Sequence, residues 1–235
     1  MNRRAFLTAV GTGTGVSLLS ACASEGPRAA AGFLKAVEQR NEQLERWLFS
    51  PAARNHVAAT ARLARDAFPN YFVSPRVPLW DESVRGVWRL QIDGAVRHPF
   101  SLSLDELMAL PGITQRVDHF CVEGWNARAE FRGVRMLDIA RMAEVTPDAG
   151  YVDFQSFDKD YHESWDMESA MHPQTLIAYG RDGHMLNAMQ GAPARLHSPV
   201  KLGYKNTKYL TRIVFMPARN GGYWSDRGYE WFGGV

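Results

Sequence analysis

The sequence predicts an α+β fold with mixed sheets and short helices, preceded by an N-terminal helical arm. From residue 70 onward, short runs that alternate apolar and polar residues are mixed irregularly with short helical patterns, as in α+β proteins. No glycine-rich turn joins a strand to a helix, which excludes a doubly wound nucleotide-binding fold. With 46% hydrophobic and 22% charged residues among 235, the chain can bury a sizeable core.

Residues 1–21 predict a cleaved export signal. In "NRRAFL", Arg3 and Arg4 precede an apolar run that is too short and weakly apolar to remain as a membrane helix, and the pair resembles a twin-arginine signal. "LSAC" resembles a lipobox, in which Cys22 is lipidated after cleavage. The simpler alternative is that Arg3 and Arg4 belong to an ordinary positively charged N-terminus. We expect an exported protein, in the periplasm or at another extracytoplasmic face, anchored to the membrane by lipid.

Residues 22–32 predict a tether, and residues 33–69 a helical arm ahead of the main domain at 70–235. Phe33, Val37, Leu44, Trp47 and Leu48 keep helical spacing, and Pro51 interrupts this first helix. The Ala- and Arg-rich residues 52–67 predict a second helix that ends before Pro69.

Within the main domain, strands and helices follow in an irregular order. Alternation predicts strands at 87–94, 113–120, 151–157, 172–183 and 209–217. Ser103 and Glu106 form a capping box that predicts a helix ending before Pro111, and residues 135–144 predict another.

Charge and cysteine content narrow the class of function. The net charge of +2 gives no reason to expect nucleic acid as a partner. If lipid occupies Cys22, then Cys121 is the only free thiol in an oxidising compartment, and it is buried and inert, paired with another chain, or a ligand. Export of an already folded protein favours the ligand. His119 and Cys121 lack the second ligand pair that zinc requires.

The residues around Cys121 resemble a known family. "CVEGW", followed by "FRGV", is similar to the molybdenum-ligand loop of the sulfite oxidase superfamily, and closest to the branch with the periplasmic methionine sulfoxide reductase catalytic subunit. The resemblance covers most of residues 70–232 and implies the sulfite-oxidase-type fold. It also implies a molybdenum–molybdopterin cofactor whose metal binds the Cys121 thiolate.

The same resemblance implies a set of cofactor contacts. "YVDFQSF", "MQGAPARLHSPVKLGYKNTK" and "YFVSPRVP" are similar to cofactor-binding segments, and they point to Phe72, Val73, Ser156, Gln190, Arg195, Asn206, Thr207 and Lys208. A guanidinium and an ammonium suit the phosphate of a pterin. Taken alone, "KLGYKNTK" is more often a solvated basic turn. Gln190 replaces the usual Asn, and Arg76 stands where a histidine is usual.

Tyr161 is the second expected catalytic residue besides Cys121. "YHES" resembles the family segment whose tyrosine lies near the metal and substrate, where a phenol can deliver a proton. The alternative is an amphipathic tyrosine at a loop edge. We also expect Trp125 beside the cavity, His119 as a candidate for lining it, and the tail at 220–235 as a cover next to it.

These features predict a molybdenum oxidoreductase that performs oxygen-atom transfer on a small oxo substrate. Sulfite oxidases usually carry an arginine just after the cysteine ligand, whereas this chain has none until Arg128, which favours reduction of a neutral S- or N-oxide. The alternatives are sulfite oxidation and a non-catalytic cofactor-binding lipoprotein. Because no Cys-x-x-Cys-His haem motif is present, we expect a separate electron-transfer protein or a quinol-linked haem subunit, and a monomer because the family's C-terminal dimerisation domain is not found.

Overall fold

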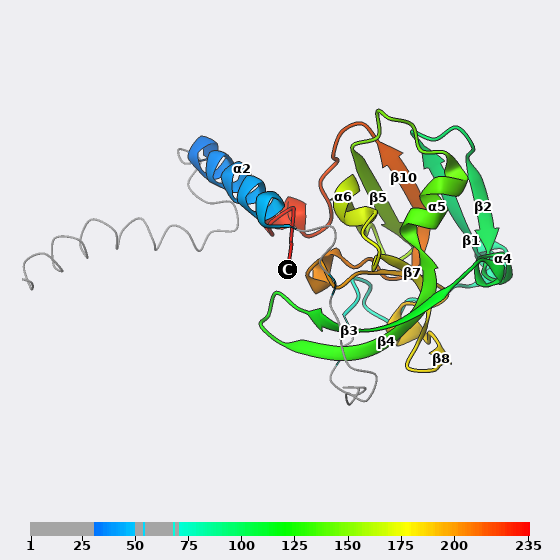
Figure 1. The fold of residues 1–235 in the computed structure, drawn as a ribbon. Helices are drawn as coiled ribbons and strands as arrows, with labels where there is room; N and C mark the ends of the chain where they lie inside the picture. The colour runs from blue at the N-terminus through cyan, green and yellow to red at the C-terminus, as the bar shows by residue number, and fades with distance from the viewer. Residues whose placement is uncertain (1–30, 50–53, 55–67, 69–70) are drawn as a thin grey trace, which may run out of the picture.

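The computed structural model describes residues 31–49, 54, 68 and 71–235 (Figure 1). The expected export signal, the lipidation site Cys22 and the second arm helix lie outside these residues. The first arm helix is α2 (Ala31–Leu48), so it begins inside the segment that we expected to be a tether. Within the described part of the chain, no helix is long and apolar enough to cross a membrane.

The main domain contains two sheets, each of five strands. The first has the order β2 (Phe100–Ser103), β1 (Arg89–Gly94), β10 (Leu210–Met216), β5 (Tyr151–Ser156) and β6 (His162–Asp166). The second has the order β3 (Ile113–Phe120), β4 (Asn126–Arg135), β7 (Leu176–Arg181) and β8 (His184–Met185), with β9 (Arg195–His197) also paired to β7. β1 runs parallel to β10 and the other pairs are antiparallel, so the predicted mixed α+β fold is confirmed.

The helices between the strands are short. They are α3 (Glu82–Arg85), α4 (Leu104–Ala109), α5 (Met136–Ala143) and α6 (Met167–Ala170), with single 3₁₀ turns η3 (Ala188–Gln190), η4 (Gly203–Lys205) and η5 (Ser225–Arg227). The capping box is confirmed, because the Ser103 hydroxyl accepts from the Glu106 amide while the Glu106 carboxylate accepts from the Ser103 amide.

The largest core lies over the first sheet. Its fully buried side chains come from β1, β5, β10, α5 and β6, and they include Leu90, Ile92, Phe154, Trp165 and Ile213. β4 is long and curved and crosses from α5 to the far end of the second sheet (Figure 1). Its register against β7 shifts at Arg132 and Gly133, where a Cβ on Gly133 would lie 2.3 Å from the Ile177 carbonyl oxygen. Glycine therefore allows the two strands to approach this closely.

The strand prediction was incomplete. It missed β2, β4, β6, β8 and β9, and the predicted strand at 172–183 is limited to β7 (Leu176–Arg181) before a turn. β6 is the most informative of these strands. The sequence of β6, "HESWD", reads as polar, yet Glu163, Ser164, Trp165 and Asp166 are all buried. Two lysines far along the chain neutralise its carboxylates, as Lys201 pairs with Asp166 and Lys205 with Glu163. No local pattern of alternation can reveal such pairing.

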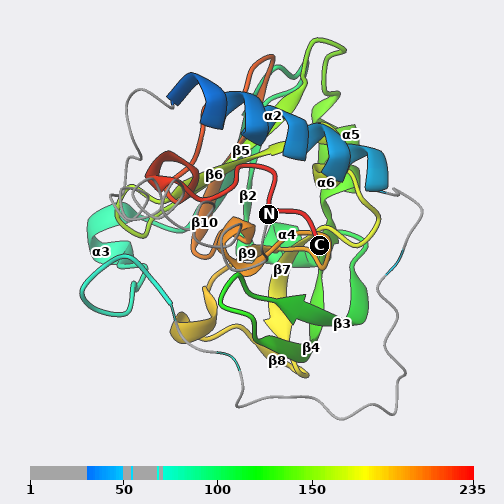
Figure 2. The ribbon, with the colours of Figure 1, turned by 90° about the vertical axis from the view of Figure 1, so that its left-hand side faces the viewer.

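α2 lies against the C-terminal segment rather than against a sheet (Figures 1 and 2). The contact is made by its last turns, where Glu42 accepts from Arg219 at 2.8 Å and the Arg46 guanidinium lies 5.7 Å from the centre of the Phe232 ring. Phe49, just after the helix, packs edge-on against Phe232.

Candidate active site

One cavity of about 450 Å³ collects side chains from segments that are distant in the sequence. Its walls are the segment at 71–73, the β3–β4 turn, the residues after β5, the segment at 189–209 and the tail at 223–229. Of the predicted cofactor and catalytic residues, those that line it are Phe72, Val73, Cys121, Ser156, Tyr161, Gln190, Arg195, Asn206 and Lys208. Thr207 does not line the cavity, since its side chain is fully buried behind it.

Cys121 sits at the start of the turn that joins β3 to β4. The Cys121 amide donates to the Trp125 carbonyl at 2.9 Å and the Gly124 amide donates to the Cys121 carbonyl at 3.0 Å, which closes the turn. Gly124 has φ +86°, a conformation that favours glycine. Burial raises the pKa of the half-buried Cys121 thiol, and a bound metal would reverse this by stabilising the thiolate.

A carboxylate, rather than an arginine, stands beside Cys121. The Glu123 Oε2 lies 3.8 Å from the Cys121 Sγ, and it accepts hydrogen bonds from the Tyr71 hydroxyl at 2.7 Å and the Trp125 indole at 2.9 Å. Arg128 does not supply the missing positive charge, because its guanidinium forms two bonds to the Asp118 carboxylate on β3. Arg76 is exposed and does not line the cavity.

Three basic side chains, Arg181, Arg195 and Lys208, also line the cavity and form its cationic wall. Burial, and then Arg181, lower the pKa of the Arg195 guanidinium to about 10, whereas burial, and then Arg195, lower the pKa of Lys208 to about 7. Arg195 donates to the carbonyls of Gln190 and Asn206, and Lys208 to those of Tyr71 and Met189. Sequence reasoning missed Arg181, which lies at the end of β7 and pairs with the adjacent Asp182.

The acidic residues of the cavity do not neutralise this cationic wall. Asp158 accepts from the Val73 amide and from both the amide and the hydroxyl of Ser74, so it serves to hold the approach segment. Glu123 is held by Tyr71 and Trp125. Arg181 is paired with Asp182, whereas Arg195 and Lys208 form no ion pair with a carboxylate in the described part of the chain, and their mutual repulsion suits the phosphate of a pterin.

Unpaired buried polar atoms support the same conclusion. Among the described residues, the Tyr209 hydroxyl, the His119 Nδ1 and the Thr207 Oγ1 are buried and have no hydrogen-bond partner. Tyr209 and His119 line the cavity. Burial lowers the pKa of His119 to about 3, so its imidazole is neutral and one nitrogen can accept or donate. Buried polar groups are ordinarily paired, so the Tyr209 hydroxyl and the His119 imidazole fit a ligand rich in hydrogen-bonding groups.

Two glycines let the backbone pack against side chains that line the cavity. A Cβ on Gly203 would lie 2.8 Å from the His119 Nε2, and a Cβ on Gly191, which has φ +102°, would lie 2.9 Å from the Lys208 Cβ. The described residues contain no cluster of three or more His, Cys, Asp or Glu side chains placed for a metal. Cys121 would hold the metal of the cofactor, and the cationic and unpaired polar groups of the cavity fit its pterin.

Tyr161 is half-buried between the cavity and the tail. Its hydroxyl donates to the Tyr204 carbonyl, and its ring stacks on Tyr223 with 5.5 Å between the ring centres. Burial, and then Glu163, raise the pKa of the Tyr161 phenol, so the group retains its proton. Its place in the wall makes it a half-buried cavity residue rather than a tyrosine at a loop edge.

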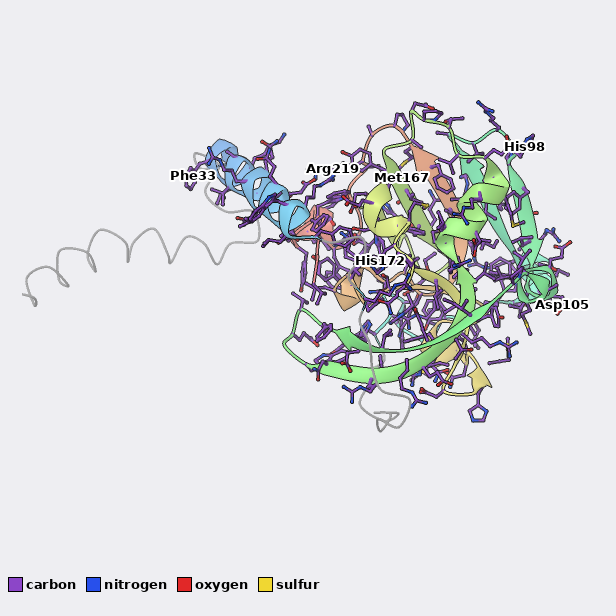
Figure 3. All side chains as sticks on the ribbon, in the orientation of Figure 1. Phe33, His98, Asp105, Met167, His172 and Arg219 are labelled. Carbon is purple, nitrogen blue, oxygen red and sulfur yellow. The ribbon has the colours of Figure 1, made fainter. Side chains whose placement is uncertain are left out.

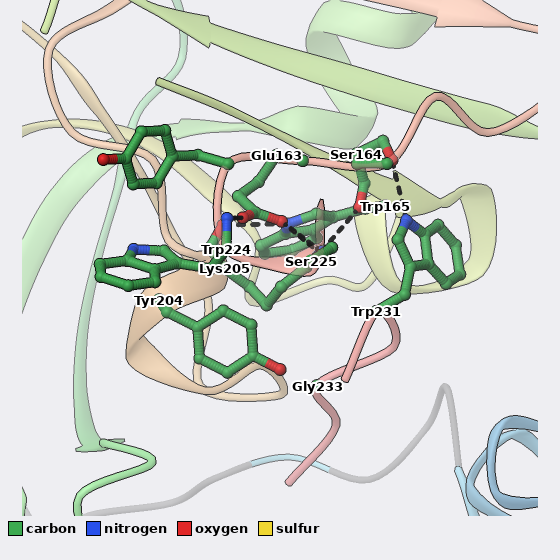
Figure 4. A network of polar contacts seen from close by, with 12 residues as sticks. Glu163, Ser164, Trp165, Tyr204, Lys205, Trp224, Ser225, Trp231 and Gly233 are labelled. Atoms are coloured by element: carbon green, nitrogen blue, oxygen red, sulfur yellow. Dashed lines mark hydrogen bonds and ion pairs between the residues drawn. The ribbon is translucent and has the colours of Figure 1, made fainter. Parts of the chain in front are cut away.

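A buried polar network holds the tail against the site (Figure 4). The Glu163 carboxylate accepts from Lys205 Nζ at 2.6 Å, from the Trp224 amide at 2.8 Å and from the Ser225 hydroxyl at 3.1 Å. Glu163 and Lys205 side chains have no exposed surface. Lys205 belongs to the predicted pterin-binding motif but faces this network instead, and its partner Glu163 is thereby a positioning residue for the tail.

The positioned tail supplies an aromatic wall. Tyr223, Trp224 and Tyr229 line the cavity. The Tyr223 amide donates to the His162 carbonyl at 2.8 Å, and the Trp224 and Tyr229 rings contact each other with 5.0 Å between centres. The tail thus lies next to the site, where we expected it.

A two-sheet α+β domain with a cysteine facing a cationic cavity is the arrangement expected of a molybdopterin-binding oxidoreductase. The chain belongs to the oxidoreductase molybdopterin binding domain family, which matches residues 76–224. It is therefore a molybdopterin-dependent enzyme of oxygen-atom transfer.

Several proteins resemble the chain over most of its length or over this domain. It is 38% identical over 99% of its length to a protein of Azospira oryzae named as protein-methionine-sulfoxide reductase subunit YedZ1, of which the match covers 87%. It is 31% identical over 66% of its length to the oxidoreductase YuiH of Bacillus subtilis, of which 77% is covered. It is 31% identical over 55% of its length to the protein-methionine-sulfoxide reductase catalytic subunit MsrP of Ralstonia nicotianae, of which 44% is covered.

A solved structure shows the same fold. The sulfane dehydrogenase SoxCD of Paracoccus pantotrophus aligns with a TM-score of 0.53 at 23% identity, over 56% of this chain and 38% of that one. This likeness supports the sulfite-oxidase-type architecture. The names of two of the relatives describe subunits, which agrees with an enzyme that exchanges electrons with a separate protein.

Proposed function

We propose that this enzyme reduces a neutral S-oxide, and that the substrate is the methionine sulfoxide side chain. Two relatives carry names of protein-methionine-sulfoxide reductase subunits, and the cavity has the polarity that such a substrate requires. We assign the cationic wall of Arg181, Arg195 and Lys208 to binding of the cofactor. The part of the cavity beside Cys121 then remains for the substrate.

The observation that carries the direction of transfer is the position of Glu123. A carboxylate 3.8 Å from the expected metal ligand repels an anion such as sulfite, but it does not repel a neutral sulfoxide. Arg128 is paired with Asp118, so it does not compensate. The charge beside Cys121 is thus the reverse of that expected for a sulfite-oxidising enzyme.

The rim of the cavity supports a substrate that is carried on a polypeptide. Tyr71, Val122, Met189 and Tyr229 line the cavity and are also exposed. An exposed apolar rim around a polar interior suits a thioether-derived side chain. The alkyl part of such a side chain packs on the rings and aliphatic groups of the rim, while its sulfoxide oxygen points into the cavity.

The chemistry that the cofactor supplies when bound is two-electron oxygen-atom transfer. The sulfoxide takes up two electrons and two protons, its S–O bond breaks, and the products are a sulfide and water. Tyr161 keeps its proton beside the cavity and its hydroxyl is hydrogen-bonded, so it is positioned to orient substrate or hold a proton. Trp125, Trp224 and Tyr229 exclude water from the substrate side.

The electrons come from a separate protein, for which a quinol-linked haem subunit is the proposed source. We further propose that the enzyme is a monomer, exported to the periplasm or another extracytoplasmic face and tethered by lipid on Cys22. The "NRRAFL" and "LSAC" motifs support export and the lipid on Cys22, and the subunit names of the relatives support a separate electron-transfer protein.

The test is a dye-linked assay on purified protein whose molybdenum and pterin have been quantified. With stoichiometric cofactor, a reduced dye should be oxidised by methionine sulfoxide, and sulfite should be a poor substrate. Glu123→Gln should raise the ratio of sulfite oxidation to sulfoxide reduction, because the repulsion is removed. Glu168→Gln is a matched control, since Glu168 is an exposed carboxylate on α6 and is not part of the cavity.

Each alternative has its own outcome in this assay. Faster oxidation of sulfite than reduction of sulfoxides by the unmodified enzyme would reverse the proposed direction. Cofactor present with no turnover of S- or N-oxides or sulfite would favour a non-catalytic cofactor-binding lipoprotein.

A further inference from the structure

α2 turns its charged side toward the domain and its apolar side away from it. Glu42 and Arg46 lie on one side of the helix, where Glu42 bonds to Arg219 and the Arg46 guanidinium lies over the Trp231 and Phe232 rings. The Glu42 side chain is only 16% exposed. A helix that packs on a globular domain normally buries its apolar side, so this arrangement is inverted.

The opposite side of α2 carries an apolar stripe that Arg40 interrupts. At about 100° of rotation per residue, one arc of about 100° contains Arg40 and five apolar residues, Phe33, Val37, Leu44, Trp47 and Leu48. All five apolar residues are exposed, and Phe33 and Trp47 have exposed fractions of 71% and 79%. Figure 3 places Phe33 at the end of α2 that is farthest from the sheets.

The lipid proposed on Cys22 selects a lipid bilayer as the surface that this stripe meets. Eight residues separate Cys22, in the lipobox, from Ala31, so an extended connection of nine steps reaches about 30 Å at most. A lipid on Cys22 would therefore hold α2 close to the membrane. α2 itself is not long and apolar enough to cross a membrane, and neither is any other helix in the described part of the chain.

The composition of α2 fits the plane of the interface. Trp47, whose ring favours the headgroup region, and the apolar Phe33 stand near the two ends of the stripe. Lys35 and Glu38 lie on other sides of the helix and would remain in water, while the long side chain of Arg40 would reach the headgroups from within the stripe. We propose that α2 lies in the interface of a lipid bilayer with Phe33, Val37, Leu44, Trp47 and Leu48 inserted, while Glu42 and Arg46 fix the oxidoreductase domain to it.

This inference is independent of the reaction that the site performs, and it can be tested without the lipid anchor. The protein is the chain from residue 23 onward, loaded with cofactor, which retains every described residue. It is mixed with sedimentable phosphatidylcholine vesicles, and the bound fraction is measured. Fluorescence quenching by brominated acyl chains then reports whether tryptophan enters the bilayer.

The unmodified protein should bind the vesicles, and Phe33→Ser combined with Trp47→Ser should lower the partition coefficient at least tenfold. The matched control is Leu79→Ser combined with Val84→Ser, which removes two equally exposed apolar side chains from another part of the surface. It should leave the partition coefficient unchanged. Phe33→Leu should retain binding, and bromine quenching should disappear when Trp47 is replaced by Phe.

Three results would overturn the proposal. The unmodified protein could remain in the supernatant, or the Phe33 and Trp47 double variant could bind as well as the control does. Light scattering could instead show a dimer that the double variant converts to a monomer, which would make a second copy the occupant of the stripe. Dye-linked activity of every variant measures whether the domain is intact, since none of these residues lines the cavity.

Discussion

Glu163→Gln tests whether the buried ion pair behind the tail supports both stability and the shape of the cavity. In the native protein the carboxylate accepts from Lys205, Trp224 and Ser225, and the two charged side chains are fully buried 2.6 Å apart. The glutamine side chain has one acceptor oxygen and one donor group. It therefore cannot accept hydrogen bonds at both positions where Glu163 has an oxygen. Its amide N–H group faces either the Trp224 amide or the Lys205 ammonium, which are donors themselves.

The expected loss of stability follows from the burial of the pair. Removing one partner of a fully buried ion pair leaves an uncompensated charge, and this costs about 3 to 5 kcal/mol. At about 2 to 4 °C per kcal/mol for a protein of this size, the melting temperature should fall by about 6 to 20 °C. An unpaired buried lysine favours its neutral form. The difference in melting temperature between Glu163→Gln and the native protein should therefore shrink as the pH rises toward the ordinary pKa of lysine.

The assay compares Glu163→Gln with Glu130→Gln, which breaks the partly exposed pair of Arg116 and Glu130. The control should lose about 0 to 1 kcal/mol. Thermal unfolding is followed by circular dichroism in holoprotein of equal molybdenum content. In the dye-linked assay, Glu163→Gln should raise KM more than it lowers kcat, because Tyr223, Trp224 and Tyr229 shift. Equal losses in the two variants, or an unchanged KM, would refute a positioning role for Glu163.

Three further outcomes are expected. Cys121→Ser should abolish molybdenum binding, as measured by elemental analysis, and unchanged metal content would remove Cys121 as the ligand. Tyr161→Phe should lower turnover with cofactor content intact, and native rates would show that its hydroxyl is not used. Asp153, 2.9 Å from His162, raises the pKa of this histidine, so the stabilisation is fully present below the unfolded pKa of about 6.5 and is lost as the pH rises through the folded pKa. The melting temperature of His162→Gln should therefore fall furthest below that of the native protein at pH 5.5 and approach it at pH 9, and a constant difference would contradict this linkage.

The sequence predicted more of the site than of the fold around it. The loop with Cys121 is continuous in the sequence, and its glycine and flanking strands are local features, so a resemblance could locate it. The approach and pterin-binding segments were similarly recognisable as short motifs. The structure brings Phe72, Ser156, Arg195 and Lys208 to one cavity, although their roles toward the cofactor stay predictions until a loaded protein is measured.

Within a motif, the sequence did not reveal which side chains face the cavity. Asn206 and Lys208 line it, whereas Thr207 between them is buried and Lys205 turns toward Glu163. The η4 turn (Gly203–Lys205) and the residues after it set these directions, and an irregular backbone has no fixed period from which they could be read.

The sequence by itself determined the class of fold, the lone thiol in a tight turn and the identity of the basic and amide groups available to a pterin. These depend on residue types and on spacing over a few positions. Only the tertiary structure decided that Glu123 stands beside Cys121 while Arg128 is paired elsewhere, that Arg181 joins the cationic wall, and that polar β6 is a buried strand. Charge interactions act through space, so their partners are set by chain segments that lie far apart in the sequence.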